Sequence, residues 1–241
     1  MAPGGGLPAA RIRHGAGRNV ADPRGPPREP RRVRLADGGP RRRRRLRDHS
    51  TGRALRACGG GVIRAVISDF GGVLTTPLIE SFRAYRSETG ISFEELGKAM
   101  ARVAEKSGGD YPLYELERGR LTEAEFLGAI EAELGGGVQL DSLRETYFAN
   151  LHPNERMIRY MRELRDRGLR LALLTNNVRE WEPHWRAKLP DIDEIFEIVV
   201  DSAFVGMRKP ERGIYELTLE RLGDGIAPAD CAFVDDTDVN C

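Results

Sequence analysis

Polar side chains follow several short apolar runs of the sequence, at points where predicted β-strands end. Asp69 follows VIRAVIS, Thr175-Asn176-Asn177 closes LRLALLT, Asp235-Asp236 follows CAFV, and Lys209-Pro210 precedes a helical pattern. In an open α/β sheet, ligands bind beyond the carboxyl ends of the strands, so we expect these groups to meet. Each alone has an ordinary explanation as a turn, a cap or a solvated side chain. Together they predict a site for an anion and a metal ion.

The chemistry that these residue types support is phosphoryl transfer. Carboxylates at positions 69, 235 and 236, with a backbone carbonyl and waters, suit the hard ion Mg²⁺, which screens a nucleophilic carboxylate from an anionic phosphate. We expect Thr175, Asn176 and Lys209 to hold the phosphoryl oxygens through hydroxyl, amide and ammonium donors. Asp69 would then attack phosphorus, and water would hydrolyse the resulting aspartyl-phosphate.

The elements that position these residues alternate between short β-branched runs and longer helical periods, which is typical of a parallel sheet with crossover helices. The predicted strands are VIRAVISD (62–69), LRLALLT (169–175), FEIVV (196–200) and CAFVDD (231–236). We predict an α/β fold, a Rossmann-like three-layer parallel sheet, formed by residues 62–76 and 169–241.

About 100 residues separate the first two predicted strands, which is too long for a structureless loop. Ser92 and Thr122 each begin an S/T-x-x-E capping box, which predicts helix starts there. We therefore expect residues 77–168 to form a helical cap with a linker helix. A cap in this position would cover the site and exclude water.

The first 61 residues differ in composition from the rest of the chain. They hold 16 Arg, no Lys and four acidic residues, a net charge of +12, whereas the remaining 180 residues carry −11. Such a segment buries too little apolar surface to offset the entropy of ordering it, so we expect disorder. We interpret it as an inert or non-native tail; contact with nucleic acid and a targeting role are the alternatives.

Other features exclude several classes of protein. No apolar run approaches the ~20 residues that span a bilayer, and no secretory signal is evident, so we expect no membrane partner and a cytoplasmic location. The three cysteines are odd in number and widely spaced, which fits neither a disulfide framework nor a zinc knuckle. The sequence leaves the oligomeric state open.

Four stretches resemble, in order and spacing, motifs I to IV of the haloacid dehalogenase (HAD) superfamily: DFGGVL, LLTNN, GMRKPERGIY and FVDDTDVN. The position of the predicted cap resembles the C1-capped subfamily. The longer stretch FEIVVDSAFVGMRKPERGIYELTLERLG is most similar to the phosphatase domain at the N-terminus of soluble epoxide hydrolases and related bacterial proteins. The resemblance implies a nucleophile at Asp69 and Mg²⁺ ligands at Asp69, Gly71, Asp235 and Asp236. It further implies catalytic and phosphate-binding roles for Thr175 and Lys209, phosphate binding by Asn176, and an asparagine closing motif IV at Asn240.

Two features depart from the family pattern. Family phosphatases carry a second aspartate two residues after the nucleophile as a proton shuttle, and here that position is Gly71. A positioned acid or base is worth about 10²–10⁴ in rate, so substrates with good leaving groups would need it least, and Glu115, Glu117 or Asp238 are candidate substitutes. The chain also stops one residue after Asn240, where the family continues into a helix and a strand, so we expect a C-terminally truncated domain.

The leading hypothesis is a Mg²⁺-dependent phosphatase that acts on a small phosphomonoester, a phosphorylated metabolite. Dehalogenase-type hydrolysis by the same nucleophile is an alternative, although its enzymes lack the metal acids present here. A catalytically weak domain that binds a ligand or partner is another. A phosphonatase would need a supported cap lysine, and Lys98 and Lys106 carry no such pattern.

Overall fold

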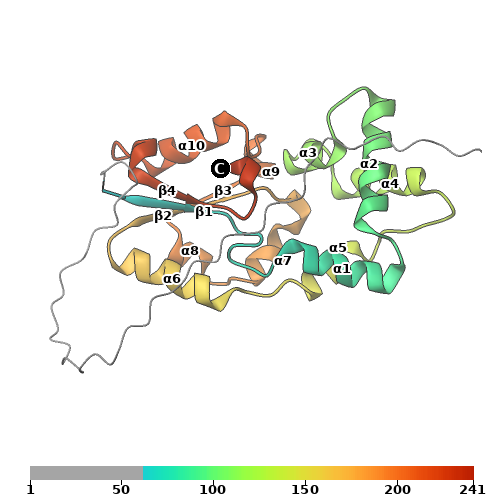
Figure 1. Cartoon of the computed structure of the whole chain (residues 1–241). Coiled ribbons are helices and arrows are strands. Elements are labelled where there is room, and N and C mark those ends of the chain that lie inside the picture. Colours follow the sequence, from blue (N-terminus) through green and yellow to red (C-terminus); the bar gives the residue numbers. More distant parts are fainter. Residues whose placement is uncertain (1–61) are drawn as a thin grey trace, which may run out of the picture. The chain divides into compact units, whose positions relative to one another are not determined.

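The computed structural model describes residues 62–241 (Figure 1). The predictions of disorder and of partner binding for the Arg-rich segment lie outside these residues. A four-stranded sheet has the order β3-β2-β1-β4, and all its neighbouring strands pair in parallel. The strands are β1 (Ala65–Ser68), β2 (Arg170–Thr175), β3 (Ile198–Asp201) and β4 (Cys231–Val234). The predicted Rossmann-like α/β fold is confirmed, and all four strands form inside the predicted runs or within one residue of them.

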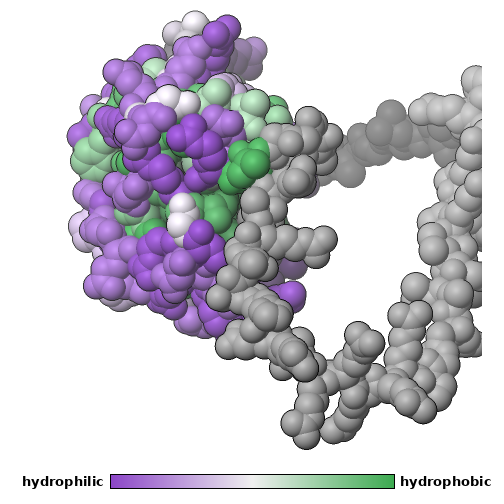
Figure 2. Space-filling view, turned by 90° about the vertical axis from the view of Figure 1, so that its left-hand side faces the viewer, coloured by the Kyte–Doolittle hydropathy of each residue, from purple (hydrophilic) through white to green (hydrophobic). Residues whose placement is uncertain are grey.

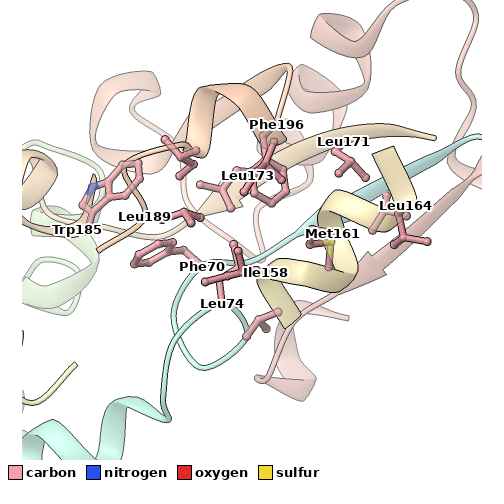
Figure 3. Close-up of a cluster of buried hydrophobic side chains, with 14 of the residues drawn as sticks. Phe70, Leu74, Ile158, Met161, Leu164, Leu171, Leu173, Trp185, Leu189 and Phe196 are labelled. Atoms are coloured by element: carbon pink, nitrogen blue, oxygen red, sulfur yellow. The ribbon is translucent and has the colours of Figure 1, made fainter. Parts of the chain in front are cut away.

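Helices cover both faces of this sheet. On one face, α6 (Glu155–Asp166), α7 (Glu182–Ala187) and α8 (Ile192–Ile195) supply apolar side chains that pack with those of β1 and β2 (Figure 3). On the other face, α10 (Arg212–Leu222) packs against β2 and β3. The short helix α9 (Ser202–Val205) follows β3 directly, and three 3₁₀ turns complete the described region: η1 (Arg179–Trp181), η2 (Pro228–Asp230) and η3 (Asp238–Asn240).

A helical segment with its own apolar core lies between β1 and α6. It contains α1 (Leu78–Thr89), α2 (Phe93–Ser107), α3 (Pro112–Glu117), α4 (Glu123–Leu134) and α5 (Leu143–Ala149). Both predicted capping boxes are present: the Ser92 hydroxyl accepts from Glu95 N at 3.2 Å, and the Thr122 hydroxyl accepts from Glu125 N at the same distance. We call α1–α5 the cap helices.

Figure 2 shows one face of the described region, on which hydrophilic residues predominate around smaller hydrophobic areas. Of the described helices, none is both long and apolar enough to cross a membrane. The cytoplasmic location stays a prediction.

Candidate active site

The turn after β1 places a carboxylate at the end of the central part of the sheet. Asp69 is only 8 % exposed, and its backbone N–H donates to Val234 O of β4 at 2.8 Å. The next residue, Phe70, is buried against Trp185 with ring centroids 5.2 Å apart, which anchors the turn in the core (Figure 3). Gly72 then turns the chain with φ +71°, a conformation that favours glycine. The bond from its backbone N–H to β4 and the packing of Phe70 therefore fix the position of Asp69.

Lys209 contacts two of the predicted site carboxylates, which come from different segments of the chain. Its side chain is 1 % exposed, with Nζ 2.8 Å from Asp69 Oδ1 and 2.6 Å from Asp235 Oδ2. A buried ammonium needs such partners, because an unpaired charge in the interior is costly. The Lys209 backbone is fixed by the Asn176 amide, whose Oδ1 accepts from Lys209 N at 2.8 Å and whose Nδ2 donates to Lys209 O at 3.1 Å. Asn176 thus positions Lys209 and keeps one N–H for a ligand; its phosphate contact stays a prediction.

The predicted metal acids lie together. Single carboxylate oxygens of Asp69, Asp235 and Asp236 all lie within 4.8 Å of one another. Asp235 is further held by Asn240 Nδ2 and Thr237 N, each donating to its Oδ1 at 2.9 Å. Three carboxylates faced by a single lysine form an oxygen-rich, anionic cluster that fits a hard divalent cation.

Electrostatics in this cluster follow from burial. Burial raises the pKa of Asp69 to about 6, while Lys209 lowers it and the Asp235 carboxylate raises it. At neutral pH the carboxyl is therefore mainly ionised, which is the form of a carboxyl group that can act as a nucleophile. A bound cation would favour the ionised form further.

A cavity of about 440 Å³ connects this cluster with the cap helices. Asp69, Gly71, Thr175, Asn176, Lys209 and Asp236 line its polar end. Most of the remaining wall is apolar, and examples from the cap helices are Leu78, Phe82, Leu96, Met100, Leu116 and Ile130. The structure thus brings together the predicted site residues, with Asp235 joined to them through Lys209, and it adds an apolar chamber that the sequence did not reveal.

Two ion pairs connect the cap helices with the loop that carries Lys209. Glu117 Oε2 accepts from Arg208 Nε at 2.6 Å, and Arg118 Nη2 lies 2.7 Å from Glu211 Oε1. The Arg208 guanidinium also lies over the Tyr114 ring, 4.1 Å from its centroid. Sequence reasoning missed the role of Arg208, although its place beside Lys209 was a usable signal.

Comparison with known proteins places this site in a family. Residues 63–240 match the haloacid dehalogenase-like hydrolase family. Mouse acyl-CoA dehydrogenase family member 10 is 28 % identical over 200 residues, which are 80 % of this chain but only 18 % of that protein. A phosphatase of Mycobacterium tuberculosis is 29 % identical, and a sesquiterpene phosphatase of Aspergillus oryzae 27 %, each over 184 residues; the matches cover 72 % of this chain and 79 % and 80 % of those proteins.

A solved structure shares the fold. A HAD family enzyme of Bacteroides thetaiotaomicron, in complex with magnesium and inorganic phosphate, superposes with a TM-score of 0.51 at 24 % identity, covering 74 % of this chain and 87 % of that one. The similarity to soluble epoxide hydrolases, the C1 subfamily and the truncation stay predictions. The match over residues 63–240 confirms what the four motifs indicated: the chain belongs to the haloacid dehalogenase-like hydrolases.

Proposed function

We propose that this hydrolase is a Mg²⁺-dependent phosphatase that acts on a phosphomonoester with an apolar organic group, through an aspartyl-phosphate at Asp69. The observation that carries the proposal is the position of the Asp69–Lys209–Asp235 charge cluster at the floor of the apolar cavity. The names of the mycobacterial and fungal relatives support a phosphatase, and the Bacteroides complex supports magnesium and phosphate as ligands.

The site residues would bind the metal ion, bind the phosphate and attack phosphorus. Asp69, Asp235, Asp236 and the Gly71 carbonyl would hold Mg²⁺, which supplies charge neutralisation between nucleophile and phosphate. Lys209, already bonded to Asp69, would direct its remaining N–H toward a phosphoryl oxygen, and the Thr175 hydroxyl and the free Asn176 N–H would do the same. Asp69 then forms the P–O bond as the alcohol leaves, and water cleaves the acyl phosphate.

The cavity sets the substrate class. Its volume lies within the range of about 300–1,000 Å³ that is usual for small-molecule pockets. Its mainly apolar wall offers few partners for the hydroxyl groups of a sugar phosphate, and burying polar groups without partners is unfavourable. An alkyl or isoprenoid-like chain would instead gain roughly 0.8 kcal/mol for each buried methylene, about fourfold in affinity.

The test is the hydrolysis of a series of n-alkyl phosphates with Mg²⁺ and with a chelator. We expect kcat/KM to rise several-fold per added methylene until the cavity is filled, and glycerol or sugar phosphates to be poor substrates. Chelation and Asp69→Asn should each abolish turnover. Full activity in Asp69→Asn would refute the mechanism, and metal-independent release of halide from a 2-haloacid would favour the dehalogenase-type alternative.

A further inference from the structure

Gly71 leaves the proposed reaction without a proton donor in the turn after Asp69. An alkoxide is a poor leaving group, so its oxygen must be protonated as the P–O bond breaks. A side chain at position 71 would also meet an obstacle, because a Cβ there would lie 3.2 Å from Leu78 Cδ2. The donor for this chain must therefore come from another element.

The acids that line the cavity are Asp69, Glu117, Glu123 and Asp236. Asp69 and Asp236 belong to the nucleophile and metal cluster. Both oxygens of Glu123 are engaged, since Oε1 accepts from Trp181 Nε1 and Oε2 from Arg144 Nη1, each at 2.7 Å. Glu123 therefore has a structural role, and Glu117 remains.

The hydrogen bonds of Glu117 differ from those of Glu123. It ends α3, its side chain is 15 % exposed, and only Oε2 is bonded, to Arg208 Nε. Among the described residues, Oε1 has no hydrogen-bond partner, and the residue lines the cavity. Because Arg208 is followed by Lys209, which contacts Asp69, adjacent residues of one loop hold both the nucleophile and Glu117.

The other candidate acids lie elsewhere. Glu115 Oε1 pairs with Arg118 at 2.7 Å and with Arg120 at 3.3 Å, and Glu115 faces a separate surface hollow. Asp238 is exposed and does not line the cavity, although its neighbours Thr237 and Val239 do.

We propose that Glu117 is the catalytic acid and base that replaces the missing aspartate, an inference that rests on the proposed phosphatase function. In the first step the Glu117 O–H bond breaks and its proton goes to the leaving oxygen, as the P–O bond to the alcohol breaks and Asp69 forms the acyl phosphate. In the second step the Glu117 carboxylate takes a proton from water as the water oxygen bonds to phosphorus. Asp69 and inorganic phosphate are released, and Glu117 is again protonated.

The surroundings of Glu117 support this cycle. Burial raises the pKa of Glu117, while the charges of Arg208, Lys209 and Arg118 lower it. Burial, and after it the carboxylates of Asp69, Asp236 and Glu117, raise the pKa of the Tyr147 phenol. Tyr147 therefore holds its proton more tightly than Glu117 and is the weaker donor.

The experiment compares two substrates that differ in their need for an acid. The p-nitrophenolate anion leaves without protonation, whereas hexanol from hexyl phosphate requires it. We expect Glu117→Gln to lower kcat/KM for hexyl phosphate by about 10²–10⁴ and for p-nitrophenyl phosphate by less than about tenfold. The fall of hexyl phosphate kcat/KM at alkaline pH should disappear in this variant, and Glu117→Asp should restore part of the selective loss.

Control variants distinguish a role of Glu117 in proton transfer from a purely structural role. Glu123→Gln removes the other cap acid of the cavity, whose two oxygens are already engaged, and should leave the ratio of kcat/KM between the two substrates unchanged. An equal loss on both substrates in Glu117→Gln, or a selective loss in Tyr147→Phe, overturns the inference. If the wild type shows no Asp69-dependent turnover of either substrate, the proposed function itself fails.

Discussion

Gly72 lies in the turn after Asp69 and beside Asp236, one of the proposed metal ligands, and its substitution by alanine should give two separable effects. A left-handed conformation such as φ +71° costs an L-residue roughly 1–2 kcal/mol. The smaller entropy of the unfolded alanine chain offsets about 0.4–1 kcal/mol of this, so the backbone effect is a destabilisation of about 1 kcal/mol. In addition, the new Cβ would lie 2.0 Å from Asp236 Oδ2, and the carboxylate must move by about 1 Å or more.

The matched control is Gly90→Ala. Gly90 has φ +78° at the end of α1, and a Cβ there meets no atom within 4 Å, so only the backbone effect remains. We expect both variants to lose about 1 kcal/mol of unfolding free energy in a chelator. Because Mg²⁺ tolerates little deviation from octahedral geometry, we expect Gly72→Ala to lose at least about tenfold in Mg²⁺ affinity.

The assay is urea unfolding with and without excess Mg²⁺. A tenfold loss of affinity reduces the stabilisation by Mg²⁺ by about 1.4 kcal/mol in Gly72→Ala, while Gly90→Ala should keep the stabilisation of the wild type. Activity should follow the same order. Equal stabilisation of both variants by Mg²⁺ would refute the placement of Asp236 in the metal site.

Two further predictions concern buried charges of the core. Burial raises the pKa of Asp201 to about 7, so the stability that its proton provides is present at low pH and is lost as the pH rises through 7. Relative to the wild type, Asp201→Asn should gain about 2–3 kcal/mol of unfolding free energy between pH 5 and pH 9, measured by urea titration at each pH. Lys209→Met leaves Asp69 and Asp235 without their buried cation and should cost about 3–5 kcal/mol, part of which Asp69→Asn should restore in the double variant.

The sequence predicted most of the sheet and the proximity of the polar residues that follow its strands, for local reasons. Short β-branched runs in a parallel sheet are buried on both faces, so they stand out from their helical surroundings. Capping boxes at Ser92 and Thr122 depend on residues three positions apart, which a sequence displays directly. The site residues lie close together because the carboxyl ends of parallel strands lie at one edge of the sheet.

What the sequence could not supply depends on contacts between distant segments. The Asn176 amide was assigned to phosphate from its type, yet its bonds to the backbone of Lys209 join residues 33 positions apart. The six-residue helix α3 is too short to be stable alone, so its place follows from packing against the rest of the chain. The same holds for the pairing of Glu117 with Arg208, which are 91 positions apart.

Leu78 connects the glycine at position 71 physically with the apolar cavity. This leucine begins α1, lines the cavity and occupies the space that a Cβ at position 71 would approach at 3.2 Å. An aspartate there would press a carboxylate against an apolar wall, where desolvation without a partner is costly. Glu117, which lies on the cap, avoids that cost, because its ion pair with Arg208 offsets its desolvation. A proton donor on the cap therefore keeps the wall beside Asp69 apolar and makes the complete site depend on the contact between α3 and the loop of Lys209.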